Sequence, residues 1–115
     1  MVASVTNLGR SGLYDWVIQR LSAVVLALYT LFMLGFLIAS PDLQYAQWQG
    51  LFAQTWMKVF SLAALISLCA HAWVGMWTVS TDYLKAAGMR FAFQFVCAGF
   101  LFTYLVWGID ILWGV

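Results

Sequence analysis

The stretch VFSLAALISLCAHAWVGMWTVSTDY, residues 59–83, decides the fold of this chain. Residues 59–79 carry no formal charge, and a run of about 20 apolar residues is long enough to cross a bilayer core as a helix. His71, the only histidine in the sequence, lies deep in this run, and Asp82 and Tyr83 follow its end. A polar side chain inside a membrane helix costs free energy, so it marks a candidate functional position. Residues eleven apart on a continuous helix differ by about 20° in direction and about 16 Å in height, so His71 and Asp82 are expected on one face.

Two further apolar runs, residues 21–39 and 91–109, are also free of charged residues. The 115-residue chain is 65% hydrophobic and 8% charged, a composition that would leave a small soluble domain with large exposed apolar patches. We therefore predict one membrane domain over residues 1–115, an all-α membrane protein with transmembrane helices at about 21–39, 59–79 and 91–109. The formal net charge of +1 gives no electrostatic basis for binding nucleic acid.

The polar segments between these runs carry signals for helix starts and for the membrane surface. Ser11 is placed to cap a first helix that follows a polar tail, residues 1–12. Ser40, Pro41 and Asp42 combine a capping hydroxyl, a proline suited to a first turn and an acid that favours the positive end of a helix. The next residues include amphipathic aromatic side chains that favour the headgroup level: Tyr45, Trp48 and Trp56. We predict a short interfacial helix between the first and second spans.

Basic residues are distributed unevenly across the predicted membrane. With three spans, the N-terminal segment and the turn from Ser80 to Arg90 lie on one side, and Lys58 marks the other. The first side holds four basic residues: Arg10, Arg20, Lys85 and Arg90. The positive-inside rule therefore places the N-terminus and the Asp82–Tyr83 pair in the cytoplasm and the C-terminus outside.

His71 has three interpretations on physical grounds. It is a structural histidine bonded to a hydroxyl of another helix, a proton relay, or a ligand to haem iron. Small residues lie on or near its face, where they would let a flat macrocycle or another helix approach: Ala64, Ser67, Gly75 and Thr78. One histidine cannot supply both axial ligands of a six-coordinate haem, so a second would have to come from another chain.

The remaining candidate residues lie near the cytoplasmic surface. Arg20 either extends to the lipid headgroups or, if haem is present, pairs with a propionate, for which a planar guanidinium is well suited. Asp82 and Tyr83 are either the solvated start of a loop or part of a quinone pocket. A phenol can donate a hydrogen bond to a quinone carbonyl, and an adjacent acid can order that phenol or relay a proton.

The chain resembles the small hydrophobic membrane anchor, the D subunit, of bacterial succinate dehydrogenase. The most specific part of the resemblance is the block from His71 to Tyr83. Other matching positions extend over nearly the whole chain: Leu8–Gly9–Arg10, Gly12, Asp15, Arg20, Leu28–Tyr29, Gly35–Phe36, Lys58–Val59–Phe60 and the closing Trp113–Gly114–Val115.

This resemblance implies a four-subunit succinate:quinone oxidoreductase, respiratory complex II, in the bacterial inner membrane. A flavoprotein and an iron–sulfur subunit pass electrons from succinate to two membrane anchors, so no catalytic residue for succinate oxidation is expected here. The resemblance implies that His71 is an axial ligand of haem b, shared with the partner anchor, and that Arg20 contacts a propionate. It implies that Tyr83 hydrogen-bonds ubiquinone, the substrate, with Asp82 beside it.

Two other functions compete with this one. The first is a small transporter or channel subunit in which His71 relays protons or bonds another helix. The second is the anchor of a related fumarate reductase, which runs the reaction in reverse.

Overall fold

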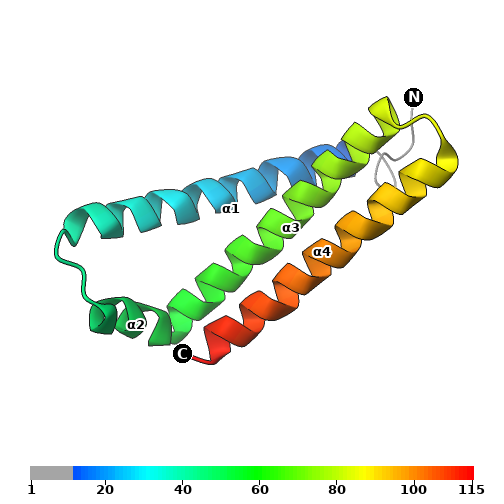
Figure 1. Cartoon of the computed structure of the whole chain (residues 1–115). Helices are drawn as coiled ribbons and strands as arrows, with labels where there is room; N and C mark the ends of the chain where they lie inside the picture. The colour runs from blue at the N-terminus through cyan, green and yellow to red at the C-terminus, as the bar shows by residue number, and fades with distance from the viewer. Residues whose placement is uncertain (1–11) are drawn as a thin grey trace.

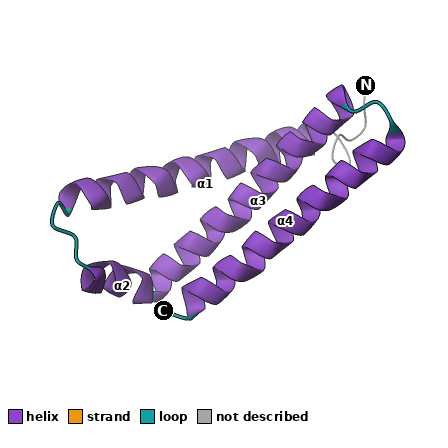
Figure 2. Cartoon of the chain, viewed as in Figure 1, coloured by secondary structure: helices purple, strands orange, loops and turns teal. Residues whose placement is uncertain are grey.

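The computed structural model describes residues 12–115 as four helices: α1 (Gly12–Ala39), α2 (Tyr45–Ala53), α3 (Thr55–Tyr83) and α4 (Ala87–Trp113). Figure 2 shows that short loops join them. In this part of the chain, α1, α3 and α4 are long and apolar enough to cross a membrane, and α2 lies between the first two. The prediction of an all-α protein with three spans and a short intervening helix is confirmed. The predicted tail and the Ser11 cap lie outside the described residues.

The central helix is α3, because both α1 and α4 pack on it. Figure 1 shows α3 and α4 side by side, with α1 crossing α3 near the start of α1. The start of α1, the end of α3 and the α3–α4 connection lie at one end of the molecule. The other end holds α2 and the C-terminus. The molecule measures 51 × 25 × 22 Å, so its long axis exceeds the roughly 30 Å hydrocarbon core of a bilayer.

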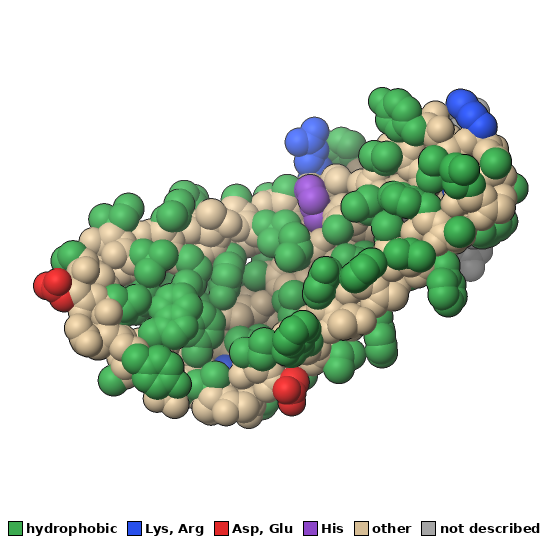
Figure 3. Space-filling view, in the orientation of Figure 1, with side chains coloured by type: hydrophobic (Ala, Val, Ile, Leu, Met, Phe, Trp, Pro, Cys, Tyr) green, Lys and Arg blue, Asp and Glu red, His purple; other side chains and the backbone are tan. Residues whose placement is uncertain are grey.

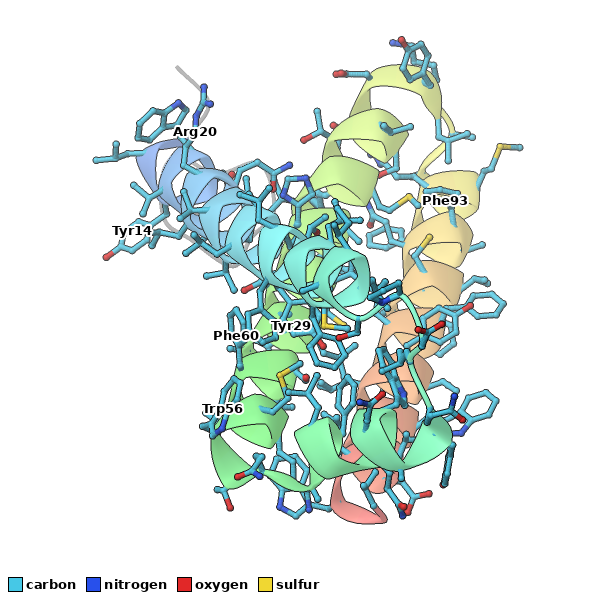
Figure 4. All side chains as sticks on the ribbon, turned by 90° about the vertical axis from the view of Figure 1, so that its left-hand side faces the viewer. Tyr14, Arg20, Tyr29, Trp56, Phe60 and Phe93 are labelled. Carbon is cyan, nitrogen blue, oxygen red and sulfur yellow. The ribbon has the colours of Figure 1, made fainter. Side chains whose placement is uncertain are left out.

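Aromatic side chains fill the space between the later part of α1 and the start of α3. The Tyr29 and Phe60 rings meet edge to face at 4.9 Å, and Phe32 packs in the same way against Phe60 and Trp56 at 5.8 Å. Figure 4 shows Tyr29, Phe60 and Trp56 gathered there. The Tyr29 hydroxyl also bonds the Ser61 hydroxyl at 2.7 Å. Van der Waals packing and hydrogen bonds of this kind hold helices together in lipid, where apolar burial alone supplies no driving force.

The α3–α4 pair is held by one close approach and one buried hydrogen bond. A Cβ on Gly108 would collide with the Leu65 side chain, so glycine lets the two helices approach at that level. Nearer the connection, Gln94 Nε2 donates to Ser80 Oγ at 2.7 Å, and the Ser80 hydroxyl donates to the Trp77 carbonyl at 2.9 Å. Ser80 is fully buried. This bond fixes the last turns of α3 against α4.

The helices extend beyond the predicted spans, and this corrects the predicted turn between the second and third spans. The connection is Leu84–Ala86 rather than the longer segment from Ser80 to Arg90. Asp82 and Tyr83 therefore lie in the last turn of α3, not in a loop. Thr81 and other hydroxyls donate to carbonyls one turn earlier, so these polar residues are accommodated within the helix instead of ending it.

The predicted start of the interfacial helix is also wrong. The Ser40 amide bonds the Leu37 carbonyl at 3.3 Å, so Ser40 closes α1 rather than capping α2, and Pro41 and Asp42 form a turn. The helix begins at Tyr45, where the amide of the preceding Gln44 donates to the Gln47 side chain at 2.9 Å. Trp56, predicted in the interfacial segment, belongs to α3.

Candidate functional site

His71 lies where α1 crosses α3, and a hydroxyl of α1 holds its ring. Its Nδ1 is 3.1 Å from the Ser22 Oγ, and the Ser22 hydroxyl is 3.0 Å from the Gln19 carbonyl oxygen. A hydroxyl has one hydrogen, and the carbonyl can only accept, so Ser22 donates to Gln19 and accepts from His71 Nδ1–H. This assignment leaves Nε2 as the ring nitrogen with a free lone pair. Nε2 makes no hydrogen bond to any residue between 12 and 115.

A groove of about 380 Å³ runs beside this ring between α1 and α3. Its walls include His71, Arg20, Asp15, Gln19 and Thr78. Figure 3 shows the imidazole at the molecular surface with a basic side chain close to it. The structure thus brings together the histidine and the arginine that were predicted to bind one cofactor.

Arg20 is exposed at the mouth of this groove. Its guanidinium carbon lies 5.3 Å from the centre of the Trp16 ring, a cation–π contact that positions the charge without neutralising it. Figure 4 shows the Arg20 side chain extending from the start of α1, away from the centre of the helix bundle. A carboxylate bound at the mouth of the groove could therefore accept hydrogen bonds from this guanidinium.

Two further features leave room for a ligand near His71. The Gln19 side-chain oxygen is buried and has no hydrogen-bond donor among the described residues, so a bound group or water is needed to satisfy it. A Cβ placed on Gly75, one turn after His71, would meet no atom within 4 Å. Ala64, by contrast, is buried at 5% exposure, so the predicted small-residue stripe is partly packed and partly open.

Asp82 and Tyr83 are exposed at the end of α3 and do not line the His71 groove. Tyr83 is 77% exposed, and its hydroxyl bonds no described residue. The continuous helix confirms that His71 and Asp82 belong to one element eleven residues apart. The structure therefore has two separate candidate positions, the groove and the end of α3.

Ser22 and Gln94 were not among the residues predicted from the sequence. Ser22 contacts a residue 49 positions away, so no spacing within one helix could reveal that pairing. Gln94 offered a signal, because an amide inside an uncharged apolar run requires a partner in lipid. That partner is the hydroxyl of Ser80 on α3.

Residues 4–107 match the sequence model of the succinate dehydrogenase/fumarate reductase transmembrane subunits. The chain belongs to this family. A succinate dehydrogenase hydrophobic membrane anchor subunit from Coxiella burnetii (strain RSA 493 / Nine Mile phase I) is 38% identical over 109 residues, 95% of each chain. The anchor subunit of Rickettsia bellii (strain RML369-C) is 30% identical over 90 residues, 76% of this chain and 70% of that one. Family membership confirms the predicted resemblance and argues against the alternative of a transporter or channel subunit.

Proposed function

We propose that the chain is the anchor subunit of a succinate:quinone oxidoreductase, shares haem b with a second anchor subunit, and forms part of a ubiquinone-reduction site. The observation that carries this proposal is the groove in which Arg20 and His71 meet, with Ser22 orienting the imidazole. The family includes succinate dehydrogenases and fumarate reductases. We favour succinate oxidation because the relatives are named as succinate dehydrogenase anchors.

The groove residues fit a haem. One ring nitrogen of His71 is held by the Ser22 hydroxyl and the other is available for iron, the usual arrangement of a metal-binding histidine. Gly75 leaves open space beside it, and Arg20 supplies a cation for a propionate. A second protein ligand to the iron would have to come from the partner anchor, because His71 is the only histidine of this chain. A haem held here would supply a one-electron carrier within the membrane.

The end of α3 fits the head of a quinone. The Tyr83 hydroxyl is accessible and can donate to a quinone carbonyl, and the Asp82 carboxylate beside it can order that phenol or pass a proton from water. Both side chains lie at the end of the molecule with the greater number of basic residues, which the positive-inside rule assigns to the cytoplasm. The iron–sulfur and flavoprotein subunits would dock on this side of the bacterial inner membrane, and the C-terminus would face the periplasm.

Replacing His71 by leucine tests the haem assignment directly. The purified His71→Leu complex should lose or alter the reduced-minus-oxidised spectrum of a low-spin b-type haem. Ser67→Ala is the matched control, because it changes a polar residue one turn away without removing an iron ligand. An unchanged low-spin spectrum in His71→Leu would show that the haem has no ligand in this chain.

A further inference from the structure

A second cavity with polar side chains in its lining lies between α2 and the end of α4. It has a volume of about 570 Å³ and is lined by Tyr45, Trp48 and Gln49 of α2 and by Asp110 and Leu112 of α4. Figure 1 places α2 and the C-terminus at the end of the molecule opposite the α3–α4 connection. The cavity is therefore remote from both positions of the proposed redox function. An aromatic lining of this kind is typical of the headgroup level, here that of the leaflet opposite Tyr83.

The charge of this cavity favours a cationic ligand group. Asp110 is the only formally charged side chain in its lining, and it forms no ion pair with a described residue. The final carbonyls of α4 add the partial negative charge of a helix C-terminus. An anionic headgroup would be repelled, whereas an ammonium group could pair with the carboxylate.

The other side chains that line the cavity could contact a phosphate and an acyl chain, the remaining parts of a phospholipid with an ammonium headgroup. Trp48 and Phe52 pack together with ring centres 4.8 Å apart, and such aromatic faces attract an ammonium group as well as apolar chains. Gln49 and Tyr45 provide hydrogen-bond donors suited to a phosphate, and Leu112 supplies apolar surface for an acyl chain. A zwitterionic phospholipid combines an ammonium, a phosphate and acyl chains, each of which one of these walls can contact.

We propose that the α2–α4 cavity binds a zwitterionic phospholipid with an ammonium headgroup, taken from the leaflet opposite Tyr83. The Asp110 carboxylate pairs with the ammonium group, and α2 holds the headgroup against the end of α4. This site ties α2 to the membrane surface, and it does not depend on haem or quinone binding.

Native mass spectrometry of the complete complex tests this proposal. The complex is transferred from vesicles that contain equal amounts of phosphatidylethanolamine and phosphatidylglycerol. The wild type should retain more phosphatidylethanolamine than phosphatidylglycerol. Asp110→Asn should lower that preference about two- to fivefold, the size expected for one partly exposed charge contact. Asp42→Asn is the matched control, because it removes an acid between α1 and α2 that does not line the cavity.

The haem absorption spectrum and the succinate–quinone activity of the complex report whether each variant has assembled. No preference between the two lipids in the wild type would overturn the proposal. So would equal effects of the two substitutions, or displacement of the retained lipid by quinone.

Discussion

Replacing Ser22 by alanine removes the hydroxyl that orients the His71 imidazole. In the structure this hydroxyl bridges the two long helices, accepting from Nδ1–H at 3.1 Å and donating to the Gln19 carbonyl at 3.0 Å. Ser22 is only 4% exposed, so little water can take its place. The variant should leave the ring donor unpaired and allow the imidazole to rotate or to change tautomer.

The expected magnitude follows from two independent estimates. Leaving a buried donor unsatisfied costs about 1–3 kcal/mol, and interhelical hydrogen bonds in membranes lie at or below the low end of that range. Loss of the group that hydrogen-bonds the other ring nitrogen of a metal-binding histidine typically weakens metal affinity about 10- to 100-fold, equivalent to about 1.4–2.8 kcal/mol. The two ranges overlap, so we expect Ser22→Ala to release haem about tenfold more readily without abolishing its binding.

The assay is the rate of haem transfer from the purified complex to an excess of a haem-accepting protein. Ser61→Ala is a close control, because it also deletes a hydroxyl joining α1 to α3, the partner there being Tyr29 at 2.7 Å. It should loosen helix packing without touching the His71 ring. Equal rates of haem loss from the two variants would refute the role assigned to Ser22, because the effect would then reflect packing alone.

Three further predictions concern the quinone position, the α3–α4 contact and the topology. Tyr83→Phe should lower the rate of quinone reduction by about one to two orders of magnitude, because it removes a hydrogen bond worth about 1–3 kcal/mol. Succinate oxidation with a soluble acceptor and the haem spectrum should persist. Equal loss of both activities would indicate an assembly defect. Gln94→Leu should destabilise the detergent-solubilised complex by about 0.6–1.7 kcal/mol in thermal unfolding. Thr103→Val, which removes a bond within one helix, should not. A reporter active only outside the cytoplasm should work after Val115; an inactive, stable fusion there with an active one after Trp48 would reverse the orientation.

The three spans were predictable because lipid imposes a simple constraint on each of them. Every backbone polar group must be hydrogen-bonded within the protein, and an uncharged run as long as residues 59–79 does this by forming a helix, because a membrane-spanning strand would be about half as long. The ends were harder to predict, because the bilayer constraint no longer applies at the surface. There Ser40 closes one helix rather than starting the next, and Thr81 bonds its own helix so that α3 continues to Tyr83.

Only those parts of the candidate site that stand out within a single helix were predictable from the sequence. His71 stood out because a lone imidazole in an apolar run has an energetic cost. Its meeting with Arg20 in one groove depends on where α1 crosses α3, and no periodicity encodes that crossing. Tyr83 was placed at the correct end of the span but in the wrong kind of segment.

The hydrogen bond between Ser22 and His71 agrees with the interpretation of a structural histidine, but it pairs only one of the two ring nitrogens, Nδ1. In lipid an unpaired polar atom costs free energy, so Nε2 needs a partner as much as Nδ1 does. None of the described residues supplies one. A purely structural role would require a hydrogen-bond donor from another subunit or from water, whereas a bound haem would give Nε2 a metal to ligate and would carry carboxylates with which Arg20 could pair. One ligand thus accounts for both the unpaired nitrogen and the cation at the mouth of the groove, and this is why we favour iron ligation over a hydrogen bond between subunits.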